Sequence, residues 1–216
     1  MEIKTPAEIG PGEFFPVVGV GPHPQPWPVG EQYDPELLAN GDRRNVLDHY
    51  RYWSVPAIVA DLNTKRHKLQ IAIENWQHDL NIGSVVRTAN AFNVSAVHII
   101  GKRDWNKRGA MVTDRYLHVL HHPTVADFAA WCKEYEVPII GIDNVPTSKH
   151  LEGAALPEKC VLLFGQEGAG MSDEGIEICE VLYAIEQYGS TRSMNASAAG
   201  AIAMYHWALQ HLPRKS

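Results

Sequence analysis

Hydrophobic and polar residues follow two different patterns along this chain, and the change comes at residue 69. From there on, short apolar runs typical of strands buried on both faces alternate with stretches whose apolar residues recur every three or four positions, as on amphipathic helices. The apolar runs predict strands over residues 69–75, 95–101, 137–143, 159–165 and 181–186. The other stretches predict helices over 81–93 and 124–135, a helix that Ser172 caps, and a helix that ends the chain. This alternation predicts an α/β fold in which a parallel sheet is flanked by helices.

The first 68 residues show neither pattern clearly. Residues 5–35 hold many of the prolines and glycines, which favour an irregular, extended arm. The region that follows is expected to be partly helical, because Asp34–Pro35–Glu36 supplies an N-cap, a proline in the first turn and an early acid. We therefore expect an N-terminal extension over 1–68 and a globular domain over 69–216.

Composition narrows the class of protein. Apolar residues make up 45% of the chain and charged residues 20%, which is typical of a globular protein. No apolar run is long enough to cross a membrane, and the N-terminus does not resemble a secretory signal. Cys132, Cys160 and Cys179 are odd in number and far apart, so we expect reduced, mostly buried thiols in a cytoplasmic protein.

Charge is distributed unevenly along the chain, whose net charge is −6. Residues 71–120 carry six basic and four acidic side chains, whereas residues 121–216 carry six and twelve. The densest basic run is GKRDWNKRG, over 101–109, with Arg115 just beyond it. A basic loop that contains an aromatic residue suits contact with nucleic-acid phosphates, although an ordinary solvated loop explains the same residues.

Three loops rich in glycine or small polar residues follow predicted strands. They are GIDN over 141–144, FGQEGAG over 164–170 and EQYGSTRSMN over 186–195. Ligands of parallel α/β sheets bind outside the carboxyl ends of the strands, so these loops predict a site for a polar ligand about the size of adenosine. The glycine-rich motifs of dinucleotide-binding and P-loop proteins are absent from the sequence.

Three short motifs carry candidate chemistry: NIGSVVRT over 81–88, FGQEGAG over 164–170 and RSMNAS over 192–197. Each has a plain explanation when taken alone, as a surface arginine, a glycine-rich turn and a helix cap. Together, and in this order, they resemble the motifs of the SPOUT superfamily, specifically its SpoU/TrmH class of RNA 2′-O-ribose methyltransferases. The resemblance covers residues 69–212.

The resemblance implies a C-terminal deep trefoil knot, S-adenosylmethionine as cofactor, tRNA or rRNA as substrate, and a homodimer formed through the knot region. It implies cofactor contacts by Ile142, Asp143, Phe164, Gly165, Gln166, Glu167, Gly168, Ile185, Gln187, Ser190, Thr191, Ser193 and Met194. The small residues Ala196, Ala199, Gly200 and Ala203 suit close helix packing, either between two subunits or within one.

Carried over from the family, Arg87 is the residue that activates the ribose hydroxyl. Because the pKa of arginine is above about 12, we expect it to fix the phosphate and the hydroxyl, not to act as a free base. Asn81, Glu167, Ser193 and Asn195 are expected to orient it, hold the loop or contact substrate. Expected RNA contacts are Arg87, Lys102, Arg103, Lys107, Arg108, Arg115 and Arg192. We expect no metal site, because no nearby acid completes one around His118 and His122.

Three questions stay open at the level of sequence. An RNA-binding protein that kept this fold without catalysis is one alternative to the methyltransferase. A small-molecule enzyme that binds another nucleotide in the same pocket is another. In the N-terminal extension, Tyr50, Tyr52 and Trp53 lie beside several arginines, where they would either stack on RNA or pack against the protein.

Overall fold

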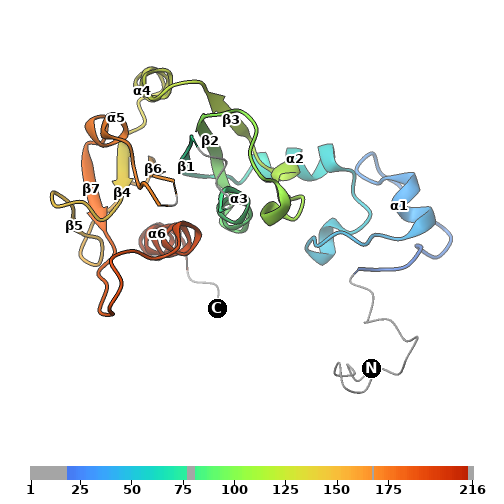
Figure 1. The fold of residues 1–216 in the computed structure, drawn as a ribbon. Coiled ribbons are helices and arrows are strands. Elements are labelled where there is room, and N and C mark those ends of the chain that lie inside the picture. The colour runs from blue at the N-terminus through green and yellow to red at the C-terminus, as the bar shows by residue number, and fades with distance from the viewer. Residues whose placement is uncertain (1–18, 77–80, 167, 214–216) are drawn as a thin grey trace. The chain divides into compact units, whose positions relative to one another are not determined.

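The computed structural model of this chain describes residues 19–76, 81–166 and 168–213. The chain forms two compact units, Met1–Asp61 and Leu62–Ser216, shown in Figure 1 and described separately below. In the described residues, no helix is both long enough and apolar enough to span a membrane.

The N-terminal unit contains the helices α1 (Pro35–Asn40), η2 (Asp48–Tyr50) and most of α2 (Val55–Asn63). The predicted start of α1 is confirmed, because the carboxylate of Asp34 accepts hydrogen bonds from the backbone nitrogens of Glu36 and Leu37 at 2.9 and 3.3 Å. The expected arm falls partly on residues 1–18, which lie outside the described residues.

A buried ion pair organises this unit. The side chain of Arg44 donates two hydrogen bonds to the Asp42 carboxylate, at 2.8 and 2.7 Å, and a third to the carbonyl of Trp53. Burial alone raises the pKa of Asp42, but the bonds from Arg44 and from the backbone of Tyr52 outweigh it and lower that pKa to about 2. Asp42 therefore stays charged and ties two distant segments together.

The aromatic residues of the unit pack against the protein. Tyr50 is buried and lies edge-on to Trp53, with ring centroids 5.5 Å apart. The hydroxyl of Tyr52 donates to the carbonyl of Gly21 at 2.6 Å. Of the two interpretations that the sequence left open, packing is the one observed for Tyr50 and Tyr52.

The C-terminal unit is built on one seven-stranded sheet in which every neighbouring pair is parallel (Figure 1). The strand order is β3-β2-β1-β6-β4-β7-β5. The strands are β1 (His67–Asn75), β2 (Val94–Gly101), β3 (Val119–His122), β4 (Ile139–Ile142), β5 (Lys149–His150), β6 (Cys160–Phe164) and β7 (Val181–Ala184). The helices are α3 (Ile82–Ala91), η3 (Arg108–Ala110), η4 (Thr113–Tyr116), α4 (Val125–Glu134), α5 (Asp173–Glu177) and α6 (Ala196–His211).

Helices cover both faces of the sheet (Figure 1). Residues of α3 and α6 form one core cluster with the strands, including Val85, Ile99 and Trp207. Residues of α4 and the segment around α5 form the second cluster on the other face, including Phe128 and Leu163. The parallel sheet flanked by helices is therefore confirmed, as are the five predicted strands and the four predicted helices, with ends that shift by a few residues.

Two buried histidines interrupt the apolar core beside α4. His98 Nδ1 lies 2.9 Å from His122 Nε2, and His98 Nε2 lies 2.7 Å from Oε1 of Gln70. The rings of Phe128 and Trp131 close over His98 at 5.4 and 4.5 Å. Burial, and to a lesser degree the neighbouring His122, lower the pKa of His98 to about 3. The cluster therefore folds in its neutral form.

We expect the stability of the protein to fall as the pH drops from about 7 toward 4, partly through His98. The pKa of His98 is about 3 in the folded protein, below its ordinary value of 6.5, so between these pH values the unfolded chain binds a proton that the folded chain does not. The stabilisation is complete above about pH 6.5 and is lost at up to about 1.4 kcal/mol per pH unit below it.

Urea unfolding at several pH values checks this, with His98→Gln as the comparison. Glutamine cannot titrate but can still hydrogen bond to its neighbours, so the variant should lose less stability per pH unit than the wild type. Carboxylates contribute equally to the pH dependence of both proteins, so their contribution cancels when the two unfolding free energies are subtracted. Parallel stability curves would contradict the assignment.

Candidate functional site

A pocket of about 490 Å³ lies at the carboxyl ends of β4, β6 and β7. Its volume falls within the range of roughly 300–1,000 Å³ that small-molecule sites occupy. The three predicted loops meet there. The pocket is lined by Ile142, Asp143, Asn144, Val145, Phe164, Gly165, Gln166, Gly168, Ala169, Gly170, Met171, Ile185, Gln187, Arg192, Ser193, Met194, Asn195, Ala196 and Ala199.

The loop after β6 folds tightly back on itself. The backbone nitrogen and carbonyl of Gln166 exchange hydrogen bonds with those of Gly170, at 3.1 and 3.0 Å. A Cβ atom at position 165 would lie 2.1 Å from the nitrogen of Met171, so only glycine allows this approach. Gly168 and Gly170 have φ values of +89° and +73°, in the left-handed region that favours glycine. The spacing of glycines in this motif is therefore a requirement of the turn.

Two carboxylates from neighbouring strands hold the far end of this loop. Asp143, just after β4, accepts a hydrogen bond from the nitrogen of Met171 at 2.6 Å. Glu74, at the end of β1, accepts from the nitrogen and the hydroxyl of Ser172 at 2.8 and 2.5 Å. Ser172 in turn caps α5 by accepting from the nitrogen of Gly175, as predicted.

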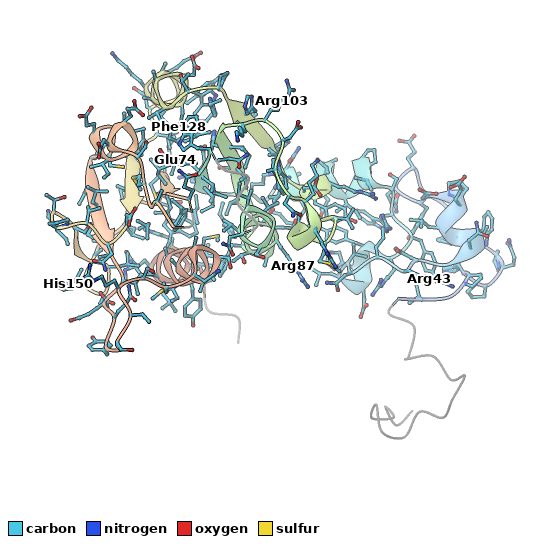
Figure 2. The ribbon with its side chains drawn as sticks, in the orientation of Figure 1. Arg43, Glu74, Arg87, Arg103, Phe128 and His150 are labelled. Atoms are coloured by element: carbon cyan, nitrogen blue, oxygen red, sulfur yellow. The ribbon has the colours of Figure 1, made fainter. Side chains whose placement is uncertain are left out.

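Glu74 is completely buried (Figure 2). Burial raises its pKa, and the hydrogen bonds that Ser172 donates oppose that shift without cancelling it. A Cβ atom at position 175 would lie 2.6 Å from Oε1 of Glu74, so the small residue there makes room for the carboxylate. Sequence reasoning did not identify Glu74, because a single acid at the end of an apolar strand gives no distinct signal.

The third loop joins two helix starts. Asn195 accepts hydrogen bonds at its Oδ1 from the nitrogens of Ser197 and Ala198, at 2.9 and 3.3 Å, and so caps α6. Its Nδ2 donates to Oδ1 of Asn81, the residue that precedes α3, at 2.8 Å. The first and third motifs are thus in direct contact through two residues expected to act together.

Most residues expected to contact the cofactor line this pocket. They are Ile142, Asp143, Phe164, Gly165, Gln166, Gly168, Ile185, Gln187, Ser193 and Met194. Ser190 and Thr191 are exposed and do not line it. Glu167 lies outside the described residues.

Several lining residues were not among the expected cofactor contacts, although three of them lie in the predicted loops: Asn144, Val145, Ala169, Gly170, Met171, Ala196 and Ala199. Asn144 has a clear structural role, since its Nδ2 donates to the carbonyl of Arg192 at 2.9 Å and links the first loop to the third. Its position directly after a predicted strand was the available signal.

Arg87 lies on α3 and outside the lining of the pocket (Figure 2). A Cβ atom on Gly83 would meet the backbone of residues 106–110 at 2.8–2.9 Å, so this side of α3 faces the basic loop. Arg87 is one helical turn further along the same side. The opposite side, at Val85, contacts α6 near Gly200. Within one chain, Arg87 is therefore exposed beside the basic loop and separate from the pocket.

All the cations expected to contact RNA are exposed: Arg87, Lys102, Arg103, Lys107, Arg108, Arg115 and Arg192. The loop between β2 and β3 carries five of them. Its apolar residues Met111 and Val112 are also exposed, at 60 and 52%, with φ values of +47° and +66°. Such strained, exposed backbone in a basic loop is more typical of a functional surface than of a simple connection.

The small residues of α6 are used within one subunit. Ala203 is fully buried in the core, and a Cβ atom on Gly200 would lie 3.6 Å from Val85 of α3. Packing within the subunit is therefore observed for Gly200 and Ala203, whereas Ala196 and Ala199 line the pocket.

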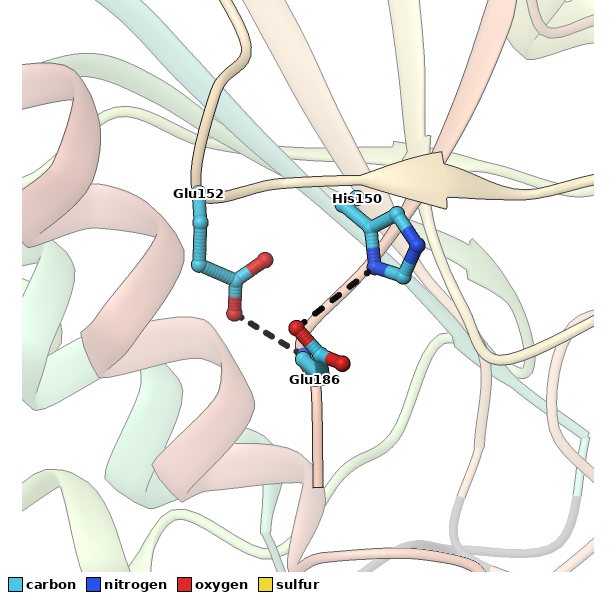
Figure 3. A group of neighbouring side chains, drawn as sticks. All are labelled: His150, Glu152 and Glu186. Carbon is cyan, nitrogen blue, oxygen red and sulfur yellow. Dashed lines mark hydrogen bonds and ion pairs between the residues drawn. The ribbon is translucent and has the colours of Figure 1, made fainter. Parts of the chain in front are cut away.

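A separate group of side chains lies at the sheet edge formed by β5 and β7 (Figure 3). The donor atoms of His150, Glu152 and Glu186 lie within 4.8 Å of one another, and all three residues are exposed. Glu152 already accepts the backbone N–H of Glu186 at 2.9 Å, and His150 Nδ1 lies 3.9 Å from Glu186. These contacts fasten the edge of the sheet.

The chain thus has an all-parallel α/β domain with a pocket at the carboxyl ends of three adjacent strands, β6, β4 and β7. The sequence profile of the SpoU rRNA Methylase family matches residues 68–205 of this chain. The chain therefore belongs to the SpoU rRNA Methylase family.

Named relatives and solved structures are also similar to it. It is 26% identical over 147 residues to a tRNA (guanosine(18)-2′-O)-methyltransferase of Borreliella burgdorferi, covering 67% of each chain. It is 30% identical over 149 residues to the 23S rRNA (guanosine-2′-O-)-methyltransferase RlmB of Neisseria meningitidis serogroup B, covering 66% of this chain and 58% of the relative.

The fold resembles that of the SpoU methyltransferase AviRb from Streptomyces viridochromogenes in complex with AdoMet. The TM-score is 0.62 at 20% identity, covering 72% of this chain and 62% of the other. The chain thus matches about two thirds or less of the length of each of these three proteins.

Asn195→Ala should lower the free energy of unfolding by about 1 kcal/mol, because it removes the cap of α6. It also removes the donor to Asn81. Asn195→Ser is the matched control, since serine caps a helix but is too short to reach Asn81. Urea unfolding should therefore show a loss in the alanine variant and little loss in the serine variant. Wild-type stability of Asn195→Ala would contradict the capping role.

Proposed function

We propose that this protein transfers a methyl group from S-adenosylmethionine to a ribose 2′-hydroxyl of tRNA or rRNA. The observation that carries the proposal is the meeting of the second and third family motifs at one pocket on the carboxyl edge of the sheet, with the first motif bonded to the third through Asn81 and Asn195. The relatives named above, which methylate guanosine 2′-oxygens in tRNA or rRNA, support the reaction. The structural neighbour with AdoMet bound supports the cofactor.

The residues of the pocket fit such a cofactor. Phe164, Ile142 and Met194 supply apolar surface for an adenine ring, and exposed backbone of the glycine loop supplies hydrogen-bonding groups. Among the described residues, Oε1 of Gln166 is buried and has no hydrogen-bond partner. A buried acceptor without a partner costs free energy, so a ligand that donates to it is favoured. Asp143 places negative charge at the pocket, which suits a sulfonium.

The chemistry assigns distinct tasks to the chain's own residues. When held by the loops that line the pocket, S-adenosylmethionine would supply an electrophilic methyl group to the 2′-oxygen, with S-adenosylhomocysteine as the leaving group and the hydroxyl proton passing to solvent. Arg87 binds the phosphate beside the reacting ribose and fixes its hydroxyl through the planar fork of donors. Asn81 and Asn195 hold the start of α3 against the third loop. Ser193 lines the pocket, where it holds the loop or contacts the substrate, and Glu167, which has the same expected roles, lies outside the described residues.

We propose that the active form is a homodimer in which one copy supplies Arg87 to the pocket of the other. Two observations support this. Arg87 is exposed and outside the pocket of its own chain. In addition, α6 presents an apolar stripe of Ile202, Tyr205 and Leu209, which are 43, 58 and 53% exposed. A continuous exposed apolar stripe suits a protein–protein contact.

We also propose that α6 forms the end of a deep trefoil knot. The side chains of His206, Trp207 and His211 bind backbone carbonyls of the segment before β6 at 2.8–3.0 Å, which supports a helix enclosed by that segment. The family match that begins at residue 68 and the division into two compact units support a further proposal on domains. An N-terminal extension over 1–68 is followed by a methyltransferase domain over 69–216.

A cytoplasmic location is proposed on the state of the cysteines. All three are free thiols, as predicted, and burial raises the pKa of each to about 12. Free, unreactive thiols suit a reducing compartment.

Calorimetry with S-adenosylhomocysteine and methyl transfer from labelled cofactor to total RNA test the function together. We expect binding to the wild type and a 2′-O-methylated nucleoside in the digested RNA. Arg87→Ala should lower kcat by roughly 100- to 1,000-fold, because an electrostatic contact to the reacting group is lost. Its affinity for S-adenosylhomocysteine should stay at the wild-type level. Arg87→Lys, which keeps the charge but not the fork of donors, is the matched control.

Absence of S-adenosylhomocysteine binding by the wild type would refute the proposed function. Loss of that binding in Arg87→Ala alone would instead make Arg87 a structural residue.

The dimer is tested by light scattering. Leu209→Glu should give a monomer, because a charge in an apolar interface is left unpaired and desolvated. Lys133→Glu, an exposed change on α4, is the control and should stay dimeric.

A subunit-mixing experiment tests whether Arg87 acts in the partner's pocket. The variant Arg87→Ala keeps an open pocket, and the pocket-filling variant Met194→Trp keeps Arg87. If Arg87 acts in the partner's pocket, a mixed dimer of the two inactive variants contains one intact site and should be active. No restoration in a proven mixed dimer would contradict this arrangement.

A further inference from the structure

A second cavity of about 590 Å³ lies beside the edge strand β3, on the same face of the sheet as α3. It is enclosed by β3 and by the basic loop between β2 and β3. Its apolar floor includes Ile99, Leu117 and Val119, and its rim includes Trp105, Lys107 and Asp114. None of the residues that line the first pocket lines this one.

Trp105 gives the cavity a flat aromatic wall. The ring is half-buried and packs against the core cluster under the loop, which fixes its position. The ammonium of Lys107 lies 5.4 Å from the ring centroid. A planar ligand can reach this face of the ring if it displaces the exposed lysine.

Asp114 adds a hydrogen-bond acceptor to the same cavity. Its carboxylate is 15% exposed and lies 3.1 Å from Nζ of Lys107, whose side chain is 66% exposed. Because the Asp114 side chain is mostly buried, a ligand that displaces Lys107 has to donate hydrogen bonds to this carboxylate in its place. A carboxylate accepts hydrogen bonds from the N–H groups on a base edge.

The surroundings of the cavity favour an anionic partner. Arg103, Arg108 and Arg115 are all exposed on the loop that encloses it. Single-stranded nucleic acid carries backbone phosphates and planar bases. Proteins that bind it place cations against the phosphates and aromatic side chains against the bases, and this cavity has both kinds of residue.

We propose that this edge cavity holds an unstacked nucleobase of the RNA substrate, stacked on Trp105, while the arginines bind the adjoining phosphates. The proposal rests on the proposed function. Because this cavity and the first pocket have no lining residue in common, we assign the cavity to a nucleotide other than the one that accepts the methyl group.

The test compares two probes on the full-length protein: a short single-stranded RNA of mixed sequence, and an abasic chain with the same number of phosphates. The wild type should prefer the RNA by roughly 5- to 150-fold, the range expected for stacking one base on an aromatic residue. Trp105→Leu should abolish most of this preference, and Trp105→Phe should retain much of it. Arg108→Gln should lower the affinity for both probes by the same factor and reduce the dependence of binding on salt.

A preference for RNA that survives in folded Trp105→Leu would overturn the base site, as would equal binding of both probes by the wild type. An acidic peptide that displaces the RNA from the wild type but not from Trp105→Leu would point to a protein partner and overturn it too. Cross-linking of thiouridine-containing RNA to the wild type needs no variant, and the cross-linked peptide should contain Trp105. If S-adenosylhomocysteine binds and only the base preference is absent, the base site is wrong and the methyltransferase assignment stands.

Discussion

The parallel pairing of β6 on both of its edges is the constraint on which the C-terminal unit depends. This strand is buried along its whole length and pairs with β1 on one side and β4 on the other. It therefore joins the group β1–β3 to the group β4, β7 and β5 in one sheet. Because all pairs are parallel, the ends of β4, β6 and β7 come to the same edge, and the loops that follow them have to share one pocket. A change that displaced β6 would separate the two groups and the pocket together.

The loop after β6 shows how that edge is made rigid. Its close return at Gly165 is held by the two backbone hydrogen bonds between Gln166 and Gly170. Asp143 and Glu74 fix the far end of the loop from β4 and β1, the two neighbours of β6. A fully buried carboxylate with a raised pKa is unfavourable in isolation. We infer that burying Glu74 lowers the stability of the fold, and that its hydrogen bonds to Ser172 are retained because they fix the position of the loop.

The sequence predicts most of this fold because its strands are continuous apolar runs buried on both faces. It does not predict β3 or β5, because neither is a continuous apolar run. Two of the four residues of β3 are histidines, His121 and His122, and β5 is only two residues long. Glycine-rich and polar loops at strand ends locate the pocket, since their chemistry is local. The contact of Asn81 with Asn195 joins residues 114 positions apart, and periodicity carries no information about such a pair. For the same reason, helical spacing shows which side of α3 carries Arg87 but not what that side faces.

The helix α3 contacts a loop at each of the two cavities. Gly83 is required for one of these contacts, in addition to being part of the family motif. At its start, Asn81 is bonded to the loop that lines the first pocket. Half a turn later, Gly83 and Gly109 bring α3 so close to the basic loop that a Cβ atom on either would lie 2.8–2.9 Å from backbone. One contact is a side-chain hydrogen bond between helix starts, and the other is direct backbone packing. The basic loop, the start of α3 and the loop that lines the first pocket are therefore joined by an unbroken series of contacts, and the small residue at position 83 is needed for the first of them.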